Sequence, residues 1–206
     1  SSPGKVDYFD YMYRQRVKER IESLRQSKTP VANLINDFHD LVVNGKPYHN
    51  FSKIWPQVER MLFKQTEKKD LTVIHGDLCF SNILYDLNSR ICKLLDPRGS
   101  FGARGVYGDI NYDIAKLYHS VHGLYDYITN DLFSYKACDN EIVFKVYVPS
   151  EVENICQVFD SVFFKRFDRS EILLIEGLLF ITMGVFHSDF PQRQLAMYTT
   201  GIIILN

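Results

Sequence analysis

Two short apolar runs separated by a turn interrupt an otherwise helical pattern in the middle of this chain. The runs are NILYD and RICKLLD, and the residues that join them include the turn formers Asp86, Asn88 and Ser89. Apolar runs of this length joined by such residues predict a β-hairpin of short strands. A β-branched stretch, LTVIHGD, precedes the hairpin, and a glycine-rich loop, PRGSFGARGVYGD, follows it. Residues 70–108 are therefore expected to form strands and loops.

Apolar residues three and four positions apart predict helices on both sides of this segment. Thr29 and Pro30 suit the start of one helix and Gly45 its end, while Asp109 or Asn111 can cap the first helix after the loop. The expected helices are 6–27, 29–45, 51–69, 112–133, 150–167, 170–189 and 191–205, with a strand at 140–149. The predicted fold is one mainly α domain over 1–206 with a small β-hairpin, divided into a helical part (1–69), a loop and hairpin part (70–108) and a second helical part (109–206).

Charge and cysteine content exclude several classes of function. The formal net charge is −1, which argues against a broad nucleic-acid-binding surface. The four cysteines are far apart and form no CxxC pair, so neither a zinc knuckle nor a disulfide framework is expected. The most apolar run, 172–186, is interrupted by Glu176 and is too short to span a bilayer. We therefore expect a cytoplasmic protein that binds neither membrane nor nucleic acid.

Three polar residues around the hairpin have the chemistry that phosphoryl transfer needs. Such a reaction requires a carboxylate to orient the acceptor hydroxyl and oxygen ligands to hold magnesium on the phosphates. Asp77 and Asn82 lie five residues apart on one loop, and Asp96 follows the second strand. Because a hairpin returns the chain to its start, Asp96 is expected beside Asn82, with Asp77 on the loop before them.

The segment HGDLCFSNIL followed by LLDPRG resembles the aminoglycoside phosphotransferase and choline kinase superfamily, which has a protein-kinase-like fold. The superfamily pattern is matched by His75-Gly76-Asp77, Asn82 and Asp96. The downstream segment GDINYDIAKLYHS also resembles the superfamily, and the similarity covers residues 70–125. The resemblance implies the carboxy-terminal lobe of a kinase-like fold that uses ATP and Mg²⁺.

The resemblance also implies a role for each matching residue. Asp77 is expected to be the catalytic base, and Asn82 and Asp96 the magnesium ligands at the nucleotide. Arg98 follows Asp96 closely, and we expect it to meet phosphate or an anionic substrate. His75 and Asp113 are expected to be structural, with Asp113 bonding backbone groups near the loop.

The amino-terminal β lobe of that superfamily, which covers the nucleotide, is not recognisable here. Residues 1–69 contain no glycine-rich loop and no strand with a suitable lysine, and the chain begins with Ser-Ser-Pro-Gly. These features suggest a lobe of a longer protein, with the missing lobe or a fused enzyme domain as its partner. The expected function is transfer of a phosphoryl group from ATP to a hydroxyl of a small molecule. The tail FHSDFPQRQLAMYTTG favours a sugar or capsule precursor.

Two other interpretations remain open from the sequence. Asp77, Asn82 and Asp96 are residue types common in turns and caps, so they are also compatible with a purely structural role. The chain is also compatible with a kinase-like module that binds or regulates without catalysis, attached to another enzyme domain.

Overall fold

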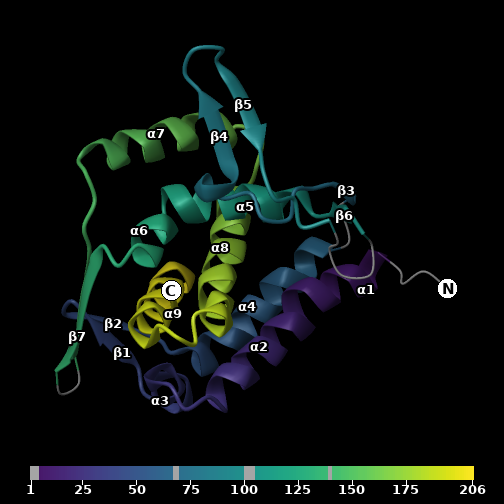
Figure 1. Ribbon diagram of the computed structural model, residues 1–206. Coiled ribbons are helices and arrows are strands. Elements are labelled where there is room, and N and C mark those ends of the chain that lie inside the picture. The colour runs from purple at the N-terminus through teal and green to yellow at the C-terminus, as the bar shows by residue number, and fades with distance from the viewer. Residues whose placement is uncertain (1–4, 67–69, 100–104, 139–140) are drawn as a thin grey trace.

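Helices form most of the computed structural model, which describes residues 5–66, 70–99, 105–138 and 141–206 (Figure 1). The helical elements are α1 (Lys5–Asp10), the π-helical turn η1 (Tyr11–Gln15), α2 (Arg16–Arg25), α3 (Pro30–Asn36), α4 (Phe51–Thr66), the 3-10 turn η2 (Phe80–Asn82), α5 (Ile110–Val121), α6 (Tyr125–Thr129), α7 (Glu151–Phe163), α8 (Arg169–Met183), the 3-10 turn η4 (Gly184–Phe186) and α9 (Pro191–Leu205). The strands are β1 (Leu41–Val43), β2 (Lys46–Tyr48), β3 (Thr72–Val73), β4 (Ile83–Asp86), β5 (Ile91–Leu94), β6 (Tyr107–Gly108), β7 (Phe133–Cys138) and β8 (Glu141–Val146). The expected mixture of many helices with little sheet is confirmed.

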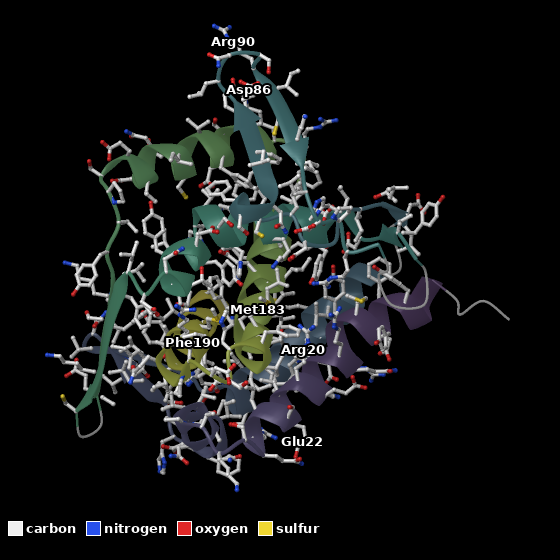
Figure 2. All side chains as sticks on the ribbon, in the orientation of Figure 1. Arg20, Glu22, Asp86, Arg90, Met183 and Phe190 are labelled. Carbon is white, nitrogen blue, oxygen red and sulfur yellow. The ribbon has the colours of Figure 1, made fainter. Side chains whose placement is uncertain are left out.

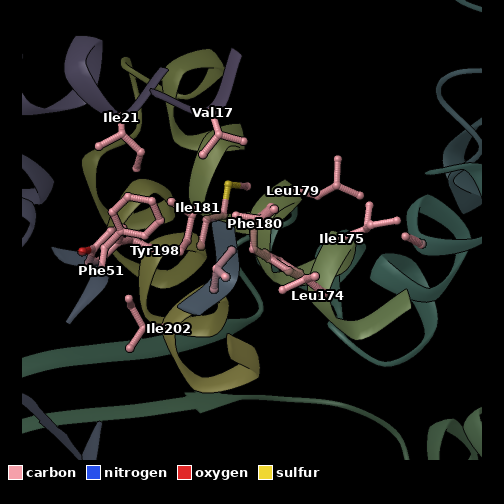
Figure 3. Close-up of a cluster of buried hydrophobic side chains, with 14 of the residues drawn as sticks. Val17, Ile21, Phe51, Leu174, Ile175, Leu179, Phe180, Ile181, Tyr198 and Ile202 are labelled. Carbon is pink, nitrogen blue, oxygen red and sulfur yellow. The ribbon is translucent and has the colours of Figure 1, made fainter. Parts of the chain in front are cut away.

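Helices α8 and α9 occupy the centre of the core, and α2, α4 and α5 pack around them (Figures 1 and 3). Helix α8 is apolar on nearly every face and buried along most of its length, as expected of a central helix. Figure 3 shows Val17 and Ile21 of α2 beside Ile181 of α8 and Tyr198 of α9. None of the helices in the described ranges is long and apolar enough to cross a membrane.

The two central helices approach each other through glycines. A Cβ atom on Gly201 would lie 2.5 Å from the Cγ1 atom of Ile181 and 2.9 Å from the carbonyl oxygen of Gly177. A Cβ atom on Gly177 would in turn meet the Cγ atom of Leu205 at 2.6 Å. The contact of α8 with α9 therefore depends on the absence of a side chain at both positions.

The expectation of a helix over 29–45 is wrong, because two short strands replace its second half. Helix α3 ends at Asn36, and β1 and β2 form an antiparallel hairpin in which Val43 is opposite Lys46. Asn44 and Gly45 both have positive φ (50° and 77°), which is the geometry an Asn-Gly hairpin turn favours. Gly45 is therefore a turn residue and not a helix end.

The same hairpin belongs to a four-stranded sheet with the order β2-β1-β8-β7. The strand predicted at 140–149 is confirmed as β8, but β7 occupies the end of the helix predicted over 112–133. That helix also breaks earlier, after Val121, and Leu124 adopts a φ of 61° in the break. Gly123 lies against Phe180, so that a Cβ atom there would overlap the Phe180 ring. This sheet lies on the opposite side of the molecule from β4 and β5 (Figure 1).

The predicted hairpin after the HGD loop is confirmed as β4 and β5. Ile83 pairs with Leu94 and Asp86 with Ile91, and the Asp86 carboxylate accepts hydrogen bonds from the backbone of Asn88. The hairpin projects from the body beside α5 (Figure 1), and its tip is marked by Asp86 and Arg90 (Figure 2).

Some helix starts follow the expected chemistry and others do not. Asp109 caps α5 by accepting from the backbone nitrogen of Asn111, as predicted, and Pro191 opens α9. Thr29 precedes α3 but its side chain makes no capping hydrogen bond, and α8 is capped by Asp168, which accepts from the backbone nitrogen of Glu171. The ends of the predictions over 51–69 and over the glycine-rich loop lie partly outside the described residues.

The close approach of α8 and α9 yields a stability prediction. Gly201→Ala should lower the free energy of unfolding by about 1–3 kcal/mol, because the new methyl group overpacks the helix contact. In a solvent-exposed helix the same change would be stabilising, so the sign is diagnostic. Urea denaturation measures the difference, with the exposed Gln192→Ala in the same helix as control. A more stable Gly201→Ala protein would contradict the close contact.

Candidate active site

The HGD loop is fixed to helix α5 by the carboxylate of Asp113. The backbone nitrogens of His75 and Gly76 donate to Asp113 at 2.6 and 2.8 Å. Burial raises the pKa of the Asp113 carboxyl, and these two hydrogen bonds offset the effect only in part. Gly76 has a φ of 79°, a conformation that glycine adopts without strain. The expected structural role of Asp113, bonding backbone groups near the loop, matches this geometry.

Asp77 forms an ion pair with Lys116 of α5. The Lys116 Nζ atom lies 2.9 Å from the Asp77 Oδ1 atom, and the Lys116 side chain is only 2% exposed whereas that of Asp77 is 37% exposed. Partial burial alone would raise the pKa of Asp77, but the positive charges of Lys116 and then Arg98, with hydrogen bonds from Lys116 and Asn82, hold that pKa below its usual value. Asp77 is therefore an ionised carboxylate at neutral pH with one face open to solvent.

Asn82 joins Asp77 to the hairpin. Its side-chain nitrogen donates to the backbone oxygen of Asp77 at 2.8 Å and to the Oδ2 atom of Asp77 at 3.3 Å. The backbone nitrogen of Leu95 donates to the carbonyl oxygen of Asn82 at 2.8 Å. The residue before Asp96 therefore lies beside Asn82, as a hairpin between the two was expected to arrange.

Two oxygen-bearing side chains, those of Asn82 and Asp96, belong to residues near the base of the hairpin. Because the amide nitrogen of Asn82 faces Asp77, its Oδ1 atom is left for another partner, and no hydrogen bond to that atom is found within the described part of the chain. Asp96 is exposed and adopts a φ of 50°. An amide oxygen and a carboxylate suit Mg²⁺, which keeps several waters and needs few protein ligands. The described residues contain no cluster of three or more His, Cys, Asp or Glu side chains arranged to hold a metal.

Arg98 and His75 complete the loop. The backbone nitrogen of Arg98 donates to the carbonyl oxygen of His75 at 2.8 Å, so the segment after Asp96 runs beside the HGD loop. The Arg98 guanidinium donates to the hydroxyl oxygen of Tyr112 at 3.4 Å. The backbone nitrogen of Asp77 donates to the His75 ring nitrogen Nδ1 at 3.3 Å, which agrees with a structural role for this histidine.

Three ring side chains pack together near Lys116. The Lys116 Nζ atom is 5.5 Å from the centre of the Tyr125 ring, and the His119 ring lies tilted against the rings of Tyr125 at 4.3 Å and Phe180 at 4.0 Å. His119 is fully buried, and burial followed by the charge of Lys116 lowers its pKa well below the usual value. His119 is therefore a neutral packing residue, and Tyr125 is the aromatic wall nearest to the ion pair.

Sequence reasoning did not identify Lys116, although it lies within the matched GDINYDIAKLYHS segment. A lysine in a helix is ordinarily solvated. The only sign of burial in the sequence was that most of the neighbouring residues of Lys116 in this helix are apolar. Cys79, between Asp77 and Asn82, is buried with its Sγ atom 3.1 Å from the Ser81 hydroxyl. This position is that of a packing residue in the loop.

Comparisons with known proteins return no relative. No protein-family model matches the chain, and neither the curated proteins nor the solved structures contain a match. The geometry around Asp77 is therefore the structural basis for a functional proposal.

The ion pair yields a prediction about the Asp77 carboxyl. Lys116→Met should raise the pKa of Asp77, because partial burial would no longer be opposed by its nearest positive charge. A titration of the side-chain carboxyl by carbon-13 NMR measures the pKa. Lys93→Met, on an exposed strand of the hairpin, serves as a matched control that should leave it unchanged. An unaltered Asp77 pKa in Lys116→Met would show that the pair does not control the charge of this carboxylate.

Proposed function

We propose that the chain is the carboxy-terminal lobe of an ATP-dependent phosphotransferase that phosphorylates a hydroxyl of a small molecule. The observation that carries the proposal is the convergence of three groups at the base of one hairpin. Asn82 hydrogen-bonds Asp77, and the backbone that leads into Asp96 hydrogen-bonds Asn82. This arrangement supplies a carboxylate for the acceptor and two oxygen ligands beside it, as phosphoryl transfer requires.

In the proposed reaction Asp77 orients the acceptor hydroxyl and takes its proton as the bond to phosphorus forms. Its low pKa suits this role, because phosphoryl transfer has a loose transition state in which proton removal needs only a weak, well-placed base. Lys116 holds one carboxylate oxygen from the buried side and Asn82 contacts the other. The exposed side of Asp77 is then the side that meets the acceptor.

Asn82 and Asp96 are the residues proposed to hold magnesium. The ion, when bound, would neutralise charge on the nucleotide phosphates. Asn82 contributes its amide oxygen because its amide nitrogen is already engaged by Asp77. Arg98 adds a positive charge that acts on Asp77 and lies close enough to meet a phosphate oxygen.

The other wall of the nucleotide site would come from a missing amino-terminal lobe or a fused enzyme domain. Strands β1 and β2, which precede the HGD loop, lie away from the β4–β5 hairpin and do not supply that wall. The acceptor would bind on the exposed side of Asp77, against the helices after residue 109. A sugar or capsule precursor remains our preferred acceptor class, on the sequence of the tail.

The alternative is a non-catalytic binding module. In that case the Asp77–Lys116 pair would only hold a charged ligand. Magnesium-dependent ATP hydrolysis by the full-length protein distinguishes the two, because a binding module would take up nucleotide without turnover.

The proposal predicts the effect of removing the base. Asp77→Asn should lower phosphoryl transfer by about a hundred- to ten-thousand-fold, the usual contribution of a general base, while the fold is kept. Transfer from radiolabelled ATP to a panel of hydroxyl compounds, measured in the full-length protein, tests this. Asp86→Asn at the exposed hairpin tip is the matched control. Unchanged transfer by Asp77→Asn would remove Asp77 from the chemistry.

A further inference from the structure

A small hollow between α2, α5 and α8 is lined by two arginines that have no carboxylate partner among the residues the structure describes. Arg16 and Arg20 are four residues apart on α2, so they lie on one face of the helix. They line the hollow together with Tyr112 of α5 and Thr182 of α8. Neither arginine forms an ion pair with any residue that the structure describes, although both are partly withdrawn from solvent.

The guanidinium of Arg20 is held in place by groups that do not neutralise it. Its Nη1 atom lies 3.5 Å from the Thr182 hydroxyl, and its guanidinium carbon is 4.8 Å from the centre of the Phe186 ring. Burial, followed by the like charges of Arg16 and Arg98, lowers the pKa of Arg20 to about 10. A folded chain that keeps partly buried like charges together stores an electrostatic cost, which a bound anion would relieve.

This arginine hollow is linked to the candidate active site through Tyr112. The Tyr112 ring lines the hollow, while its hydroxyl accepts a hydrogen bond from Arg98. The charge of Arg98 acts on both Arg20 and Asp77. The charge of Arg98 is therefore felt both at the hollow and at the carboxylate proposed as the base.

We propose that Arg16 and Arg20, with Arg98 at the catalytic edge, bind a phosphate group carried by the acceptor substrate. Guanidinium groups bind phosphate through paired hydrogen bonds and keep their charge when partly buried. Figure 2 shows Arg20 away from Asp86 and Arg90 at the tip of the β4–β5 hairpin. The acceptor class is then a small molecule with a free hydroxyl and an existing phosphate. This assignment of the acceptor rests on the proposed function, but the phosphate site itself does not.

Calorimetric titration with inorganic phosphate at constant ionic strength tests the site. Wild-type protein should bind phosphate saturably, and Arg20→Gln or Arg16→Gln should weaken binding by at least about ten-fold, the effect of losing one charge-assisted partner. Arg166 is an exposed arginine just before the start of α8. Arg166→Gln is therefore the matched control and should bind phosphate as the wild type does. Absence of saturable binding, or binding unchanged in Arg20→Gln, would overturn the proposal.

Two further measurements keep the result independent of folding and of catalysis. Arg20→Lys keeps the charge but loses the planar fork, so it should bind phosphate with an affinity between those of wild type and Arg20→Gln, while circular dichroism checks the fold of each variant. Asp77→Asn keeps all three arginines and should still bind phosphate saturably, which separates failure of this site from failure of the proposed chemistry. Competition between phosphate and magnesium-ADP would assign the arginines to the nucleotide and overturn the acceptor assignment, whereas no competition supports it.

Discussion

The architecture around the candidate site depends on one carboxylate that accepts two backbone hydrogen bonds. Asp113 projects from buried helix α5 and binds the nitrogens of His75 and Gly76, which fixes the loop at the point where it turns. Asp77 is the next residue, and it meets Lys116 one helical turn further along α5. Because both contacts come from the same rigid helix, the position of the Asp77 carboxylate is set by the core and not by the loop.

This arrangement explains how a surface hairpin can present a precise constellation of polar groups. The hairpin is held at its base by the backbone bond from Leu95 to Asn82, and Asn82 is tied to Asp77. Helix α5 is in turn packed on α8, the central apolar helix. The core therefore orients the site through a short chain of contacts, and the exposed strands need little stability of their own.

Local chemistry explains which features were predictable from the sequence. The β4–β5 hairpin and the Asp109 cap were foreseen because their signals are turn and cap residues a few positions apart. The β1–β2 hairpin was missed because an Asn-Gly pair also resembles a helix end, and only pairing of β1 with the distant strand β8 selects the turn. The burial of Lys116 was missed, and the absence of an ion pair at Arg16 and Arg20 within the described residues could not be foreseen. Both features depend on packing between segments far apart in the chain.

We propose that the base of the hairpin is a magnesium and phosphate site beside Asp77. Manganese can replace magnesium at oxygen ligands and broadens the NMR signals of nearby nuclei. In the protein with ADP, added Mn²⁺ should broaden the signals of Asn82 and Asp96 most strongly, and Asp96→Asn should abolish this local effect. Broadening centred on other acidic residues, with these two signals unaffected, would contradict a magnesium site at this position.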